Sequence, residues 1–263
     1  MTINLKNFLS SKKKTTKMGD FQELKNIEGL QVSSVSADLY KNGRDDLTLF
    51  YFPNGSNYAV AYTKNSIVSE SIIWNRKNTK NNIKALVVNT KNANTFTGEQ
   101  GLTGLNDVAK TLLENLKKLE NENSYEKSKF KEILFASTGV IGEKFPVEKI
   151  KTSIPNLVSN LKINKNKLIW LKVATAIMTT DTKPKVAYSE IKLGDKIVRI
   201  AGIAKGSGMI APNLATMFSF IFTDADISSV VLNKYLSKVL TNTFNAISVD
   251  SDTSTNDMVA IFS

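Results

Sequence analysis

The 263-residue sequence contains no cysteine and no histidine. The absence of cysteine excludes a disulfide framework, a thiolate nucleophile and a cysteine-bound iron–sulfur cluster. The absence of histidine excludes a Ser-His-Asp triad and the zinc sites that depend on imidazole. Any enzymatic proton transfer in this chain must therefore use a carboxylate, a lysine, a tyrosine or an α-amino group.

Arginine is also scarce, because only three of the 35 basic residues are arginines in a chain of net charge +11. Proteins that read nucleic acids commonly use arginine for bidentate contacts with phosphates and base edges. No recognised nucleic-acid-binding motif accompanies the lysines. A basic nucleic-acid-associated protein is thus the least favoured interpretation, and we expect no nucleic-acid partner.

Long hydrophobic runs are absent as well. A membrane-spanning helix needs about 20 apolar residues, and no run approaches that length. The first 18 residues are rich in lysine and lack the apolar stretch of a secretory signal. We expect no membrane contact, a cytoplasmic location, and a basic, partly mobile tail over residues 1–18.

With 41% hydrophobic residues, the sequence is typical of a globular protein. Runs of apolar residues, or apolar residues at every second position, predict strands, and apolar residues spaced three or four positions apart predict helices. The expected strands and helices are interleaved along the chain. This order indicates a mixed α/β (α+β) fold of layered sheets and helices. The expected strands cover residues 47–52, 58–62, 83–89, 133–137, 186–193, 196–203, 216–223 and 258–262. The expected helices cover residues 104–119, a stretch opening at Pro146, 168–178 and 228–243.

The segment 205–217, KGSGMIAPNLATM, is the most informative stretch. Its glycines fit either an anion-binding loop or an ordinary tight turn. A second interpretation starts from Thr216, because a threonine at a chain N-terminus carries its own base, the α-amino group. Self-cleavage before Thr216 would expose that amine, and it requires a small preceding residue such as Ala215. Taken alone the pattern is weak, since most threonines at strand starts are structural.

Three further clusters carry candidate chemistry. Thr138 and Gly139 follow a predicted strand, where a hydroxyl and a backbone N–H could form an oxyanion hole or simply mark the exit from the strand. The MTTDT run around Thr179 could bind a polar substrate or cap a helix. The acidic segment 250–257 imitates a calcium loop, but Thr255 and Ile261 occupy the positions that require Gly and Glu, so we reject calcium binding there.

Five motifs occur in an order that resembles one family. They are NxxNAN with TGEQG within residues 89–101, STGVIG at 137–142, AIMTTDT at 176–182, KGSGMIAPNLATM at 205–217 and SVDSDTSTND at 248–257. The chain resembles the ornithine acetyltransferases, also called glutamate N-acetyltransferases, of arginine biosynthesis. That family usually has Ser-Gly where this chain has Thr90-Lys91, and Gly where it has Ser251.

The resemblance implies self-cleavage between Ala215 and Thr216. It also implies an acyltransferase that moves an acetyl group from N2-acetylornithine to glutamate through acetyl-Thr216. Thr138 and Gly139 would form the oxyanion hole. Whether acetyl-CoA also serves as a donor stays open, and no metal or organic cofactor is implied.

The same resemblance implies that Thr179, Lys205 and Thr216 bind substrate. It implies a layered fold analogous to the N-terminal-nucleophile hydrolases. Residues 19–215 would form the α-chain region and residues 216–263 the start of a β-chain region. The processed chains would remain associated, as a heterotetramer in the family.

The resembled family continues beyond the position of Ser263. The chain is therefore either a fragment of a longer product or a truncated, non-catalytic remnant. Because residues 258–262 are the last expected strand, we expect its neighbours in the sheet to be missing. An uncovered apolar edge of this kind promotes aggregation.

Overall fold

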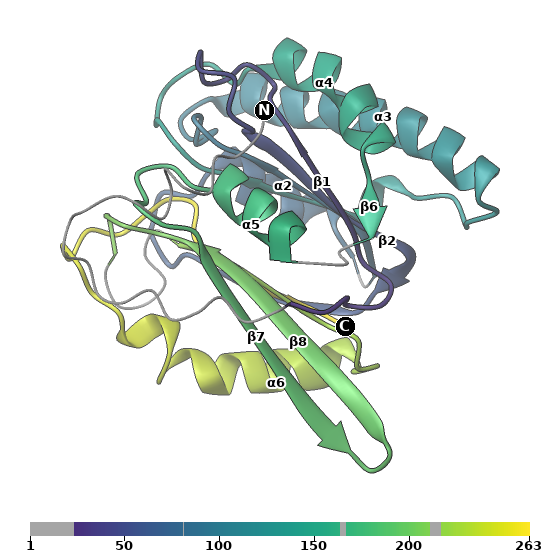
Figure 1. The fold of residues 1–263 in the computed structure, drawn as a ribbon. Helices are drawn as coiled ribbons and strands as arrows, with labels where there is room; N and C mark the ends of the chain where they lie inside the picture. The colour runs from purple at the N-terminus through teal and green to yellow at the C-terminus, as the bar shows by residue number, and fades with distance from the viewer. Residues whose placement is uncertain (1–23, 81, 164–166, 211–216) are drawn as a thin grey trace.

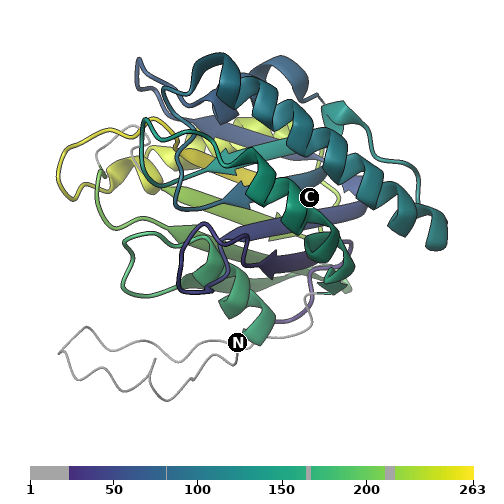
Figure 2. The same cartoon turned by 90° about the horizontal axis from the view of Figure 1, so that it is seen from above.

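The computed structural model describes residues 24–80, 82–163, 167–210 and 217–263. Two mixed β-sheets pack face to face, and helices cover the outer face of each (Figure 1). The same layers are seen from above in Figure 2, where the two longest helices lie across the strands. The expected mixed α/β class with layered sheets and helices is confirmed.

Sheet A has five strands in the order β5-β4-β2-β1-β6. β4 and β5 are parallel, with Asn89 opposite Ser137 at their carboxyl ends, and the other pairs are antiparallel. Every residue of β4 and of β5 is buried, as expected for apolar runs covered on both faces. The strands are β1 (Gln31–Val35), β2 (Leu47–Ser56), β4 (Ile83–Asn89), β5 (Ile133–Ser137) and β6 (Lys162–Ile163).

Sheet B has five strands in the order β3-β10-β9-β8-β7. The strands are β3 (Tyr58–Tyr62), β7 (Lys185–Leu193), β8 (Lys196–Lys205), β9 (Phe218–Thr223) and β10 (Met258–Phe262). β10 lies inside this sheet, antiparallel to β3 and parallel to β9. The expectation that the last strand lacks neighbours was therefore wrong, because β3, almost 200 residues earlier in the sequence, supplies one of them.

Three helices cover sheet A: α2 (Glu70–Asn78), α3 (Gly98–Glu122) and α4 (Val147–Ser159). α6 (Ser229–Leu240) covers the outer face of sheet B, where Leu232, Leu236 and Leu240 pack on β3 and β10. α5 (Lys167–Ala176) contributes Trp170 to the core between the sheets. Two short 3-10 turns, Phe130–Glu132 and Phe244–Ala246, complete the described elements. No helix in the described part of the chain is long and apolar enough to cross a membrane.

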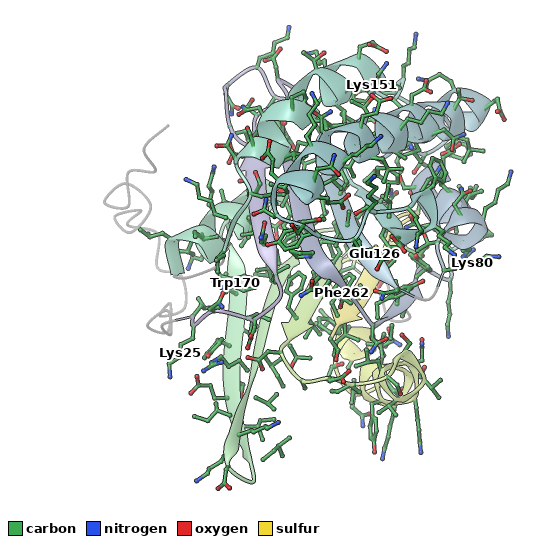
Figure 3. The ribbon with its side chains drawn as sticks, turned by 90° about the vertical axis from the view of Figure 1, so that its right-hand side faces the viewer. Lys25, Lys80, Glu126, Lys151, Trp170 and Phe262 are labelled. Carbon is green, nitrogen blue, oxygen red and sulfur yellow. The ribbon has the colours of Figure 1, made fainter. Side chains whose placement is uncertain are left out.

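The core between the sheets is a cluster of aromatic rings. Phe50 of β2 stacks on Phe222 of β9 with ring centroids 5.0 Å apart, and Phe262 of β10 stacks on Phe52 at 5.2 Å. Figure 3 shows Phe262 within the body of the protein, whereas Lys80 and Lys151 extend from its outside. These contacts join strands that precede residues 211–216 to strands that follow them. The two parts of the chain therefore share one core.

Candidate active site

The candidate residues gather at one end of the sandwich, where β4, β5 and β8 end and β9 and β10 begin. Asn256, just before β10, connects the sheets at this end. Its amide Nδ2 donates to the backbone carbonyls of Ser137 and Ala93, at 2.6 Å each. The end of β5 in sheet A is thereby held against the start of β10 in sheet B.

The candidate oxyanion residues follow β5 directly. The backbone leaves the strand at Thr138 and pairs with the loop at Asn92 on either side of Gly139. Gly139 has φ +141°, and a Cβ there would lie 2.1 Å from the carbonyl carbon of Lys91. Only glycine fits this close approach of two backbone segments. The sequence argument for a glycine that allows close contact is consistent with this geometry.

Thr138 and Gly139 keep two donors available. Within the described ranges, neither the hydroxyl of Thr138 nor the N–H of Gly139 has a hydrogen-bond partner. By contrast, the hydroxyl of the preceding Ser137 is used internally and donates to Asn89 Oδ1 at 2.7 Å. A hydroxyl and an adjacent N–H held on a rigid turn are the arrangement that stabilises a developing oxyanion.

Lys205, the last residue of β8, is 3% exposed. Its Nζ donates to Thr179 Oγ1 at 3.2 Å and lies 5.5 Å from the ring centroid of Phe218. Burial lowers the pKa of Lys205 to about 8, although the carboxylates of Asp181 and Asp257 oppose the shift. The structure thus brings together Thr179 and Lys205, two of the predicted substrate-binding residues.

Asp181 fixes the loop that carries Thr179. Its Oδ1 accepts hydrogen bonds from the backbone N–H of Gly206, at 2.8 Å, and from Lys185 Nζ, at 2.5 Å. Burial alone would raise the pKa of Asp181, but these hydrogen bonds hold it below its ordinary value. The carboxylate is therefore engaged in holding this loop to the end of β8 and the start of β7.

Asp257 is a site residue that the sequence analysis did not identify. It is 1% exposed, and its Oδ1 accepts the backbone N–H of Met217 at 2.7 Å. Its Oδ2 is buried and has no hydrogen-bond partner among the described residues. Burial raises the pKa of Asp257 to about 8, so the carboxyl is mostly protonated at neutral pH. The only sequence signal was its place at the end of the acidic segment 250–257.

The predicted scissile bond between Ala215 and Thr216 lies outside the described residues, in the interval 211–216. The residues on either side of that interval, Ile210 and Met217, are 5% and 7% exposed. Met217 is bound to Asp257, which adjoins the Asn256 link to β5. The structure therefore places Thr179 and Lys205 beside the start of β9, the strand that Thr216 precedes in the sequence. Asn256 links the same region to Ser137, the residue before Thr138 and Gly139.

The departures from the resembled family coincide with special backbone conformations. Lys91 has φ +72° and Ser251 has φ +64°, at the two positions where that family usually has glycine. Left-handed backbone costs a non-glycine residue about 1 kcal/mol or more. Both residues therefore adopt a backbone conformation that glycine adopts at lower cost.

In the part of the chain that the structure describes, no group of three or more acidic side chains is placed to hold a metal ion. The carboxylate of Asp250, in the segment that imitates a calcium loop, instead accepts the backbone N–H groups of Met209 and Ile210. Both of its oxygens therefore bind the backbone just after β8.

The architecture defines a class. L-aminopeptidase D-Ala-esterase/amidase from Ochrobactrum anthropi, described as a variant of the N-terminal-nucleophile hydrolase fold, superposes with a TM-score of 0.53 at 9% identity, over 90% of this chain and 72% of that one. The layered sandwich with helices outside both sheets therefore has the same general architecture as this variant of the N-terminal-nucleophile hydrolase fold. That likeness concerns the fold alone.

The chain itself belongs to the ArgJ family, whose family model matches residues 31–263. It is 41% identical over 241 residues to the arginine biosynthesis bifunctional protein ArgJ of Gluconobacter oxydans, covering 91% of this chain and 54% of that protein. The ArgJ of Bartonella quintana is 40% identical over 244 residues, with 92% and 56% covered. The chain thus spans about half the length of these relatives.

Solved structures agree with this assignment. ArgJ from Bacillus halodurans superposes with a TM-score of 0.59 at 26% identity, over 71% of this chain and 91% of that chain. Ornithine acetyltransferase from Mycobacterium tuberculosis superposes with a TM-score of 0.61 at 23% identity, over 74% and 98%. The expected membership of the ornithine acetyltransferase family is confirmed.

Asp257 and Lys205 predict an unusual pH dependence of stability. The folded state keeps the Asp257 proton between pH 3.8 and about 8, where the unfolded chain has lost it, so the free energy of unfolding falls as pH rises through this range. Lys205 has the opposite sign: its pKa falls from 10.5 to about 8, so the free energy of unfolding rises again between these values.

The absence of histidine makes this dependence measurable, since no other side chain at its ordinary pKa titrates between pH 5 and 8. Urea unfolding should give a free energy up to about 4 kcal/mol lower at pH 8 than at pH 5, at about 1.4 kcal/mol per pH unit. Asp257→Asn should remove most of that fall, while Asp252→Asn, an exposed change in the same loop, should retain it. An equally steep fall in Asp257→Asn would assign the proton to another group.

Proposed function

We propose that this chain is part of a self-cleaving acetyltransferase of arginine biosynthesis. The enzyme moves an acetyl group from N2-acetylornithine to glutamate through an acetyl ester on Thr216. The relatives named arginine biosynthesis bifunctional protein support this assignment, although the chain covers about half of their length. The five motifs of the resembled family support the individual roles.

The observation that carries the proposal is the buried ammonium group of Lys205 beside Thr179. Lys205 forms no ion pair with any described residue, and its Nζ donates to a neutral hydroxyl. A lysine this deeply buried costs stability unless an anion pairs with it. The α-carboxylate of an amino-acid substrate supplies that anion by a charge-assisted hydrogen bond. A non-catalytic remnant, the alternative, has no use for this arrangement.

The self-cleavage begins when Thr216 Oγ attacks the carbonyl carbon of Ala215. The C–N bond between the two residues breaks, the nitrogen takes up a proton in place of the one lost by the hydroxyl, and an ester remains. Water then hydrolyses the ester, so that Ala215 gains a carboxylate and Thr216 regains its hydroxyl. The released α-amino group is the base that the acetyl transfer requires.

In the transfer, Thr216 Oγ attacks the acetyl carbonyl of the donor while the new α-amino group accepts its proton. Thr138 and Gly139 donate to the oxyanion of the tetrahedral intermediate. Ornithine leaves and takes the proton. The amine of glutamate then attacks the acetyl ester, the bond between the acetyl carbon and Thr216 Oγ breaks, and Thr216 Oγ regains its proton from the attacking amine by way of the α-amino group. Acetyl-CoA is a second donor in this scheme, since a thioester acylates the same hydroxyl, and no metal or organic cofactor takes part.

The remaining parts of the proposal concern assembly. The α-chain region (19–215) and the β-chain region that starts at Thr216 stay together after cleavage and associate further into a heterotetramer in the cytoplasm. The shared core of Phe50, Phe52, Phe222 and Phe262 supports the first of these points, because the rings come from both regions.

Mass spectrometry of the purified chain, together with an acetyl-transfer assay, tests the proposal. We expect an N-terminal piece of 215 residues and a second piece that begins with Thr216. The reading frame extended beyond Ser263 should transfer acetyl groups from N2-acetylornithine to glutamate. A new terminus at another residue would refute the cleavage mechanism, and a correctly cut, extended chain without transfer activity would favour the non-catalytic remnant.

A further inference from the structure

The loop that joins β1 to β2, residues 36–46, lies at the same end of the sandwich as the candidate site, because the first residue of β2 pairs with the last residue of β4. Asp46 fixes this loop from inside. Its side chain is fully buried, and its carboxylate accepts three backbone N–H groups of the loop, at 2.7, 2.8 and 3.0 Å. Its own carbonyl accepts the N–H of Thr90, just after β4, at 2.9 Å. The loop is therefore a well-anchored support.

Arg44 reaches from this loop to the carboxyl end of α5. Its Nη2 donates to the backbone carbonyl of Thr175 at 3.1 Å and to that of Met178 at 2.8 Å. Its guanidinium carbon lies 4.5 Å from the ring centroid of Tyr40. Figure 2 shows this dark purple loop beside α5. The last carbonyls of a helix have no partner within the helix, and a cation there also interacts favourably with the helix dipole. Arg44 therefore caps α5 from a distant part of the chain.

The cap adjoins one of the predicted substrate-binding residues. Met178 directly precedes Thr179, whose hydroxyl accepts a hydrogen bond from Lys205 Nζ at 3.2 Å. A hydroxyl that accepts in this way can still donate its own hydrogen. On the other side of Thr179, Asp181 accepts the N–H of the residue after Lys205, at 2.8 Å. Thr179 thus lies between two anchored points, and Arg44 supplies the one on the helix side.

From these contacts we infer that Arg44 is a positioning residue for the substrate-binding pair Thr179 and Lys205. It fixes the carboxyl end of α5, and through Met178 it fixes the place of the Thr179 hydroxyl beside Lys205 Nζ. This inference rests on the proposed function, in which the α-carboxylate of the substrate binds at this pair. A carboxylate can bond to both groups only when they stand at the right separation, and a misplacement of about 1 Å can cost about 10²-fold in rate.

The guanidinium group of Arg44 is suited to this task. Arginine is rare in the chain, at three of 35 basic residues. Among the residues that the structure describes, Arg44 forms no ion pair, whereas Arg199 pairs with Asp224 at 3.1 Å. A guanidinium donates in a fixed planar fork and stacks on an aromatic ring, which the point charge of a lysine does not reproduce. The cap therefore depends on the shape of this group as well as on its charge.

Binding and steady-state kinetics of Arg44 variants in the extended reading frame test the inference. Arg44→Ala should raise the dissociation constant for L-glutamate, measured by titration calorimetry, and the Michaelis constants of both substrates by at least about 10-fold. The turnover number should change less, because Thr179 acts in binding. Arg44→Lys should give a smaller rise, since an ammonium keeps the charge without the fork. Arg76→Ala, an exposed arginine that also lies near a tyrosine ring, should change neither constant.

A double-mutant cycle separates positioning from direct contact with the substrate. If Arg44 acts through Thr179, then Arg44→Ala should change the dissociation constant by less than about 2-fold in a chain that already carries Thr179→Ala. An undiminished effect in that background would overturn the positioning role, because Arg44 would then act on the substrate independently of Thr179.

Melting temperatures of the same variants separate positioning from folding. A loss of stability alone lowers the turnover number and the number of binding sites, because fewer molecules are folded, but it leaves the dissociation and Michaelis constants unchanged. If Arg44→Ala does not fold, Arg44→Lys and its cycle with Thr179→Ala decide the question. Unchanged constants in folded Arg44 variants would overturn this inference alone. An unchanged enzyme that binds neither L-glutamate nor N2-acetylornithine would overturn the proposed function, and the inference with it.

Discussion

Thr216→Ala is expected to leave the chain uncut and to abolish acetyl transfer. Alanine lacks the hydroxyl that attacks the carbonyl of Ala215, and an uncut chain never exposes the α-amino group that serves as base. Both losses should be complete within detection. Intact-mass measurement tests the first, and transfer from N2-acetylornithine to glutamate in the extended reading frame tests the second.

Thr216→Ser is the matched control, because it keeps the hydroxyl and removes only a methyl group. It should retain part of both activities. Thr243→Ala, which removes an exposed hydroxyl after α6, should change neither. Efficient cleavage in Thr216→Ala would show that another group is the nucleophile.

Thr138→Ala is expected to lower the turnover number for acetyl transfer by about 10²–10³, the usual effect of removing one oxyanion donor. The Michaelis constant should change little, because the lost hydrogen bond forms only as the oxyanion develops. Steady-state kinetics with N2-acetylornithine over a range of concentrations separates the two constants.

Thr138→Ser should recover most of the turnover, since the donor returns. Thr152→Ala is a matched threonine control, because its hydroxyl bonds only to the carbonyl of Glu148 on the exposed face of α4. A loss confined to the Michaelis constant would identify Thr138 as a substrate-binding residue instead of an oxyanion donor.

Much of the fold was predictable, since local patterns decide which residues form strands. β3, β4, β5 and β10 have the predicted bounds, and the predicted ribbon of β7 and β8 turns at Gly194 with φ +61°. β1 and α2 were missed. Ser33 and Ser34 interrupt the apolar pattern of β1 although both are buried, and α2 buries polar residues such as Glu70 and Asn75.

Strand order could not be derived from such patterns. The error about β10 arose because its partner β3 is far away in the sequence, and pairing over that distance has no local signature. The same limit applies to the site. The motif residues Thr138, Thr179 and Lys205 were identified, whereas the part played by Asp257 depends on a hydrogen bond to Met217 across 40 residues.

The order of strands in sheet B has a consequence for a cut chain. β9 pairs with β8 on one side and with β10 on the other, and β10 also pairs with β3. The two strands that follow residues 211–216, β9 and β10, thus lie between strands that precede them, β8 on one side and β3 on the other. Breaking the chain there severs one covalent connection, yet every ladder remains. It also changes the molecularity of refolding: a nicked protein must reassemble from two molecules, so its melting temperature depends on protein concentration, whereas that of the intact chain does not.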